Sequence, residues 1–442
     1  MMRLVAVQCR VLFMVFWALA GSAHAKDLPS SSPERQGVSS ERLERVSELA
    51  ERYVDEAKVP GIVNLILRNG RVIHLEAHGT RGAGDDTPLR EDDLFRIYSM
   101  TKPVTAVAAM QLYEQGKFHL SDPVTKFVPE FKDLKVLNEE GKLEDLERPM
   151  TMHQLLTHTA GLTYHFEAAT QEVDRQYVMS DLSASENLDV YVAKLAKIPL
   201  RYQPGSRWHY SVAVDVTGLI IERLSGQPLD EYFREHIFAP LKMQDTFFEV
   251  PEEKRDRLAA NHFINPENGA LVDFRFAPPP YNPRPGVAGS DFFDVSLFAG
   301  GMGLVSTAMD YARFAEMVRN GGSLDGVRIL SPKTVNFMVQ DHLASSLGVT
   351  GSGENPADAW SESGYGFGLG FGVITNPVAY GVVGSIGEYS WGGAAGTIFW
   401  VDPEEELVVV SLIQLMNSPW SLRSDLKVAT YQALNETYTD SR

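Results

Sequence analysis

A serine and a lysine three positions apart are the residues of this chain best suited to nucleophilic chemistry. Ser99 and Lys102 fall within the stretch from Phe95 to Val104, where an apolar run ends and a helix is expected to begin. If Ser99 caps that helix, Lys102 lies one turn further along on the same face, so its ammonium can reach the serine hydroxyl. The spacing therefore predicts a serine nucleophile assisted by a lysine.

The Ser-x-x-Lys pattern of Ser99 and Lys102 is not informative by itself, because Ser424 and Lys427 repeat it in an expected C-terminal surface helix. The surrounding sequence carries the information. Alone, the pattern more often marks a capping serine and a solvated lysine. Ser99 differs because it follows an apolar strand-like run and heads the apolar stretch from Pro103 to Gln115. A buried helix there would direct backbone N–H groups at a developing oxyanion.

Ser99-Met100-Thr101-Lys102 resembles the first signature of serine β-lactamases and penicillin-binding proteins, most of all the class C type and the family VIII carboxylesterases. Other passages resemble the same family in the same order along nearly the whole chain. They are Leu155–Leu162, Pro204–Ser211, Gly364–Gly368 and Trp391–Gly393. The resemblance implies an α/β (α+β) fold, in which an antiparallel sheet is flanked by helices and carries an inserted helical region.

The second signature of that family, Tyr-x-Asn, is represented here by Tyr210-Ser211-Val212. The resemblance implies that Tyr210 moves the proton between Ser99 and the leaving group, and a nearby ammonium favours the ionised form of a phenol. Val212 departs from the pattern, because the asparagine of β-lactamases contacts the amide side chain of the substrate. The exchange disfavours amide-bearing substrates.

The third signature, usually Lys-Thr-Gly, is matched by Trp391-Gly392-Gly393. An indole offers one neutral N–H donor and cannot replace the ammonium that binds a substrate carboxylate. Gly392 and Gly393 allow the strand to approach the substrate closely. By resemblance, the N–H groups of Ser99 and Ala394 form the oxyanion hole. We therefore expect a serine hydrolase for small neutral carboxylic esters.

Other functions are compatible with the same residues. The chain could act on β-lactams or D-amino-acid peptides, or transfer the acyl group to an acceptor other than water. A catalytically inactive protein that binds the cell envelope is the alternative from a different class. Histidine catalysis is disfavoured, since His158 and His209 fall in family passages and no Gly-x-Ser-x-Gly occurs. No metal motif is present, and no cofactor is expected.

The overall charge of the 442-residue chain is −18, which argues against nucleic acid and anionic membranes as partners. Residues 1–25 have the order of a secretory signal peptide, with the apolar run Val11–Ala20 and an expected cleavage after Ala25. The run is short for a membrane span. The single cysteine, Cys9, lies inside the signal, so the mature chain would have no disulfide. These features predict an exported, periplasmic or secreted protein without a membrane anchor.

Residues 26–38 read as a tether and 39–442 as one domain, with sheet-containing parts at 39–98 and about 290–442 and a mainly helical part at about 99–289. Asn-Gly between Ile62–Leu67 and Val72–Ala77 predicts a hairpin, and Thr397–Val401 with Leu407–Leu415 predicts another. Ser39 or Ser40 is expected to cap an amphipathic helix, and Leu422–Leu434 to form the last helix.

The helical part is expected to contain short helices, with no strand of any length between Phe118 and about Asp245. The predicted helices are Ser121–Phe127, Met152–Thr157, Leu188–Leu195, Val212–Leu224 and Leu229–Phe238, followed later by Ala308–Met317. The polar stretch Thr163–Asp189 is a candidate flap over the site. Proline-rich Phe274–Gly289 should run extended and could rim the site. Gly300-Gly301-Met302-Gly303 is expected to be a turn.

Overall fold

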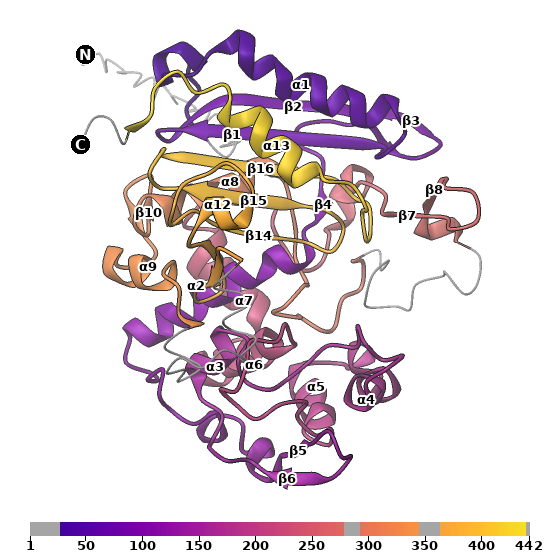
Figure 1. Ribbon diagram of the computed structural model, residues 1–442, viewed down its shortest axis with the longest axis vertical. Coiled ribbons are helices and arrows are strands. Elements are labelled where there is room, and N and C mark those ends of the chain that lie inside the picture. The colour runs from indigo at the N-terminus through magenta and orange to yellow at the C-terminus, as the bar shows by residue number, and fades with distance from the viewer. Residues whose placement is uncertain (1–26, 278–291, 344–362, 439–442) are drawn as a thin grey trace, which may run out of the picture.

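The central feature of the computed structural model, which describes residues 27–277, 292–343 and 363–438, is an antiparallel sheet (Figure 1). The predicted signal peptide and most of Phe274–Gly289 lie outside the described residues. In spatial order the strands of the sheet are β12 (Tyr365–Phe367), β13 (Gly372–Ile374), β14 (Tyr389–Gly392), β15 (Ile398–Asp402), β16 (Leu407–Leu412), β1 (Gly61–Arg68), β2 (Arg71–Gly82) and β3 (Asp85–Pro88).

Both predicted hairpins are confirmed. β1 pairs with β2 around Asn69 and Gly70, whose φ angles of 57° and 68° are the left-handed values that such a tight turn requires. β15 pairs with β16. β16 also pairs with β1, with Leu65 opposite Val410. The sheet therefore joins the N-terminal and C-terminal parts of the chain, as the resemblance implied.

Helices cover both faces of the sheet. α1 (Ser40–Asp55) and α13 (Leu422–Tyr431) lie side by side on one face, and α8 (Ala308–Arg319) packs on the other (Figure 1). Ser39 caps α1 through a hydrogen bond that its side chain accepts from the Arg42 amide at 3.2 Å. Apolar residues at helical spacing bury one side of each helix against the sheet.

Residues 27–38 do not form the free tether that their polar composition suggested. Leu28 and Val38 are buried, and the Ser31 amide donates to the Val72 carbonyl at 2.9 Å. The 3₁₀ turn Pro33–Gln36 lies between these contacts. The few apolar side chains of the stretch are enough to hold it against the sheet.

The helical part follows α2 (Thr101–Glu114), which is apolar on nearly all sides and buried in the main core. The other described helices are α3 (Met152–Leu156), α4 (Glu172–Ser180), α5 (Leu188–Leu195), α6 (Ala213–Ser225), α7 (Leu229–Phe233), α9 (Pro332–Met338) and α12 (Pro377–Tyr380). α7 continues into a π-helical turn, Arg234–Phe238. The predicted helices at α3, α5 and α6 are confirmed to within two residues at each end.

Some predictions for this part are wrong. One small hairpin occurs where no strands were expected: β5 (Lys135–Leu137) with β6 (Leu143–Asp145). A second, β7 (His262–Ile264) with β8 (Leu271–Asp273), lies beyond the range of that prediction. Ser121–Phe127 holds only the 3₁₀ turn Val124–Lys126, and Phe274–Phe276 is a 3₁₀ turn rather than extended chain. The remaining short strands are β4 (Phe95–Arg96), β9 (Val305–Ser306), β10 (Ser323–Leu324) and β11 (Val327–Arg328).

Candidate active site

Ser99 lies in the tight turn that joins β4 to α2. It is the middle residue of a 3₁₀ turn, Tyr98–Met100, and Met100 is the residue that precedes the helix, so the expectation that Ser99 caps α2 is wrong. Tyr98 adopts φ +43°, an unfavourable conformation for a bulky residue, and its hydroxyl accepts a hydrogen bond from Asn261 at 2.9 Å. The surrounding contacts hold a strained turn directly before the serine.

The structure brings Ser99, Lys102 and Tyr210 together. The Lys102 ammonium donates to Ser99 Oγ at 3.0 Å, and the phenol oxygen of Tyr210 lies 2.7 Å from the same Oγ. Lys102 is fully buried, and its Nζ lies 4.6 Å from the centre of the Tyr210 ring. A serine oxygen held between an ammonium and a phenol can exchange its proton with either group.

Asp215 and Gly301 also lie near Lys102, and neither was predicted from the sequence as a site residue. The Gly301 carbonyl accepts a hydrogen bond from Lys102 at 2.7 Å, while the Gly301 amide donates to Asp215 Oδ1 at 2.9 Å. A Cβ at position 301 would lie 2.7 Å from Asp215 Oδ2, so any other residue would have to displace the Asp215 carboxylate. The predicted turn at Gly300–Gly303 is confirmed, and it links Lys102 to a carboxylate on α6.

Asp215 is a buried acid whose pKa is raised by burial, while the nearby Lys102 charge acts in the opposite direction. Its Oδ2 has no hydrogen-bond partner among the described residues. The sequence held one signal for this residue, since Asp215 is the only charged residue in the apolar run Val212–Ile221. A lone acid on the buried side of a helix seldom occurs without a partner.

The turn after β14 lies against the backbone that leads into Ser99. A Cβ at Gly393 would lie 2.4 Å from the Ile97 carbonyl oxygen, and the Thr397 hydroxyl donates to the same oxygen at 3.3 Å. Ala394, the next residue of this turn, is exposed. None of the described backbone hydrogen bonds uses the amide of Ser99 or Ala394 as donor.

Trp391 on β14 forms one wall beside the phenol. Its ring centre lies 5.5 Å from that of Tyr210 and 5.1 Å from that of Phe367. The Trp391 Nε1 atom is buried and has no hydrogen-bond partner among the described residues. Val212, which takes the place of the substrate-contacting asparagine in the family pattern, is buried in the main core next to the first residue of α6. A Cβ at Gly392 would meet the Arg423 guanidinium, which would have to move to make room for it.

The two histidines near Tyr210 support the site without touching the nucleophile. His158 packs its ring 4.8 Å from the phenol ring, and burial, reinforced by the Lys102 charge, lowers its pKa well below the usual value. Burial also lowers the pKa of His209 to about 4. The His209 ring contacts the Thr163 hydroxyl at 3.0 Å. Both rings are therefore neutral at neutral pH, and none of their described hydrogen bonds involves Ser99.

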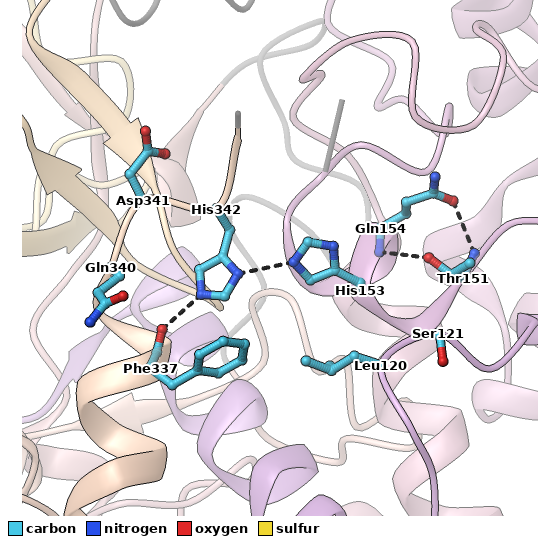
Figure 2. Close-up of a pocket in the computed structure, with 9 residues that line it drawn as sticks. All are labelled: Leu120, Ser121, Thr151, His153, Gln154, Phe337, Gln340, Asp341 and His342. Atoms are coloured by element: carbon cyan, nitrogen blue, oxygen red, sulfur yellow. Dashed lines mark hydrogen bonds between the residues drawn. The ribbon is translucent and has the colours of Figure 1, made fainter. Parts of the chain in front are cut away.

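A separate cavity of about 520 Å³ lies between α3 and the segment after α9 (Figure 2). His153 and His342 both line it and are joined directly by a hydrogen bond between Nε2 and Nδ1 at 3.0 Å, and His342 Nε2 donates to the Phe337 carbonyl at 2.7 Å. The pair fastens the helical part to the sheet-containing part. Among the residues that the structure describes, no group of three or more His, Cys, Asp or Glu side chains could hold a metal ion.

The fold and this constellation define a serine hydrolase of the β-lactamase-like superfamily, and comparison with known proteins agrees. The chain belongs to the Beta-lactamase family, whose sequence profile matches residues 46–433. It is 35% identical to the Mycobacterium tuberculosis protein Rv1367c, over 81% of this chain and 87% of that protein. It is 33% identical to Esterase EstB of Burkholderia gladioli, over 83% and 89% of the two chains.

A solved structure places the chain near the esterases of the superfamily. EstCE1, described as a hydrolase with promiscuous acyltransferase activity, superimposes with a TM-score of 0.74 at 28% identity, covering 88% of this chain and 99% of that one. The fold class and the kinship with family VIII esterases expected from the sequence are confirmed. Within the described ranges, no helix is long and apolar enough to cross a bilayer.

Proposed function

We propose that this serine hydrolase cleaves small neutral carboxylic esters through an acyl-enzyme on Ser99. Tyr210, beside the Lys102 ammonium, acts as the base that takes the proton of Ser99 while Oγ attacks the ester carbonyl. The C–O bond to the alcohol then breaks, and Tyr210 returns the proton to the departing alkoxide. Water attacks the acyl-serine with Tyr210 again as base, which releases the acid and restores Ser99.

The oxyanion formed in each step needs donors close to the serine. The amides of Ser99 and Ala394 are free of other described backbone partners, and the turn that carries Ala394 is fixed against Ile97. Donors that are already in place lower the barrier because no reorganisation is needed when charge develops. We assign both amides to the oxyanion hole.

The observation that carries this proposal is the position of Ser99 Oγ between Lys102 Nζ and the Tyr210 phenol, at 3.0 Å and 2.7 Å. The preference for neutral esters is supported by Trp391, which stands where β-lactamases have a carboxylate-binding lysine. An indole N–H provides one uncharged donor and an apolar face. The similarity to Esterase EstB points in the same direction.

The test is hydrolysis of p-nitrophenyl acetate and of a chromogenic cephalosporin by the wild type and by Ser99→Ala. We expect ester turnover to exceed cephalosporin turnover and to fall by about 10³-fold or more in the variant. A fluorophosphonate probe should label the wild type alone, which would also reject the inactive envelope-binding alternative. Substantial ester hydrolysis by Ser99→Ala would disprove the proposal.

Acyl transfer is a second candidate activity, favoured by the similarity to EstCE1 and its acyltransferase activity. In that case an alcohol replaces water in the second half of the reaction. Adding alcohols to the ester assay and measuring new ester products, at constant p-nitrophenol release, would separate transfer from hydrolysis.

We also propose that the protein is exported and that the signal peptide is removed after Ala25. The support is the charged start, apolar run and small residues of 1–25, which lie outside the described residues. N-terminal sequencing of the exported protein should begin at Lys26, and recovery of the intact chain from the cytoplasm would contradict the proposal.

A further inference from the structure

Aromatic rings surround the phenol of Tyr210, and they differ in how much of their surface is exposed to solvent. The ring centres nearest to that of Tyr210 belong to His158, Tyr164, Trp391, Trp208 and Phe166, at 4.8, 5.2, 5.5, 6.2 and 6.5 Å. Most of these side chains are buried or half-buried. Phe166 is the exception, since 68% of its surface is exposed.

Phe166 is held in a defined orientation despite its exposure. One face stacks on Tyr164, with ring centres 5.0 Å apart and an angle of 26° between the planes. The Phe166 ring is also almost parallel to that of Tyr210, at 18°. A large apolar side chain left in water beside a reactive group gains stability when a ligand covers it.

The reaction itself decides which half of an ester would meet this ring. Tyr210 returns its proton to the leaving alkoxide, so the alcohol half must lie next to the phenol. The carbonyl oxygen must lie toward the amides of Ser99 and Ala394, the proposed oxyanion hole. Phe166 stacks beside Tyr210 and therefore belongs to the alcohol side.

We propose that Phe166 is a specificity-determining residue that selects esters whose alcohol half carries a planar aromatic ring. This inference rests on the proposed esterase function and names the substrate class of the same site. A flat ring can stack on the exposed face of Phe166, parallel to the Tyr164 ring behind it. Two stacked aromatic rings bind each other about three- to tenfold more tightly than two apolar groups of equal contact area. The kcat/KM for an ester with an aromatic alcohol half should therefore exceed that for a non-aromatic ester of similar size by the same factor.

Three acetates separate stacking from size: benzyl acetate, cyclohexylmethyl acetate and ethyl acetate. All have the same acyl group and release primary alcohols, so the chemical step is matched. Cyclohexylmethyl acetate has a ring of similar area that is neither flat nor aromatic. The quantity to measure is kcat/KM for the wild type, Phe166→Leu and the control variant Met179→Ala, which changes an 83% exposed apolar residue of α4.

The wild type should prefer benzyl to cyclohexylmethyl acetate by about three- to tenfold, and Phe166→Leu should reduce this ratio to about one. Turnover of ethyl acetate should fall less than turnover of benzyl acetate in Phe166→Leu, because Leu keeps an apolar contact, and should stay within about twofold in Met179→Ala. Met179→Ala should keep the benzyl preference. A Phe166→Leu variant that retains the preference, or that loses activity equally on all three acetates, would overturn the inference.

Failure of the underlying function would look different. If the wild type hydrolysed none of the three acetates, or if Ser99→Ala hydrolysed them as fast, the esterase proposal itself would fall. An intact esterase with no benzyl preference would remove only the role of Phe166. If Met179→Ala also lost the benzyl preference, that preference would depend on the fold of residues 163–189 and not on stacking with Phe166. This result would also overturn the inference.

Discussion

Identical substitutions on two neighbouring phenols, Tyr210→Phe and Tyr164→Phe, distinguish proton transfer from packing. Their ring centres are 5.2 Å apart. The Tyr210 oxygen lies 2.7 Å from Ser99 Oγ, whereas the Tyr164 hydroxyl is buried without a partner among the described residues. Burial, and next the proximity of Tyr210, raise the pKa of Tyr164 well above the usual value. Tyr164 therefore stays neutral and cannot serve as a base at neutral pH.

The expected changes in kcat/KM and in the free energy of unfolding follow from the contacts of the two hydroxyl groups. A positioned proton-transfer group contributes about 10²- to 10⁴-fold, or ~3–5 kcal/mol of transition-state stabilisation, so Tyr210→Phe should reduce kcat/KM by that factor. Its free energy of unfolding should change by only about 1 kcal/mol, the net value of one hydrogen bond. Tyr164→Phe removes an uncompensated buried hydroxyl, so the free energy of unfolding should stay equal or rise by about 1 kcal/mol.

The assay is steady-state hydrolysis of p-nitrophenyl acetate together with urea unfolding of the wild type and both variants. For Tyr164→Phe we expect kcat/KM within about twofold of the wild type. The reasoning would be refuted if Tyr164→Phe lost as much activity as Tyr210→Phe, or if Tyr210→Phe kept more than about a tenth of the activity. Unfolding data show whether a loss of activity reflects a loss of folded protein.

Two further predictions concern charged and titratable groups away from the serine. Burial, and next His342, lower the pKa of His153 to about 4, below the ~6.5 of an unfolded histidine. The unfolded chain then binds the proton first, so His153 should contribute about 1–2 kcal/mol, allowing for partial exposure, to the fall in the free energy of unfolding from pH 7 to pH 5. In urea unfolding, the fall for His153→Gln should be smaller than that of the wild type by this amount, while other buried histidines such as His209 keep their share. Lys427→Met leaves the buried carboxylate of Glu388 without its cation and should cost about 3–5 kcal/mol in thermal unfolding. The kcat/KM of folded Lys427→Met should be unchanged, and adding Glu388→Gln should restore much of the stability.

Much of the fold could be predicted because its signals are local. Asn69-Gly70 between two apolar runs specifies a hairpin through its own backbone preferences, and Ser39 caps α1 within three residues of itself. The missed elements have weak local signals. β5 and β6 are three residues long, too short for alternation to show, and α4 is a mostly polar helix inside the expected flap.

The site was only partly predictable, because its parts are far apart in sequence. Ser99 and Lys102 lie on one helical turn, so spacing alone suggests their contact. Tyr210 stands 111 positions away from Ser99, and only the family resemblance associated the two. Gly301 accepts a hydrogen bond from Lys102 and Phe166 stacks beside Tyr210, and these contacts between distant parts of the chain are encoded by no short pattern.

The two Ser-x-x-Lys copies show what separates a candidate nucleophile from a structural match. Lys102 faces the hydroxyl of Ser99, a backbone carbonyl and the ring of Tyr210, so its ammonium can favour a nearby phenolate. Lys427 is bound to the carboxylate of Glu388, which holds its charge in place for stability. The Ser-x-x-Lys spacing is the same in both places, but only Lys102 contacts its serine in a described hydrogen bond. The groups that contact the lysine ammonium, apart from the serine, decide whether its charge is available for chemistry.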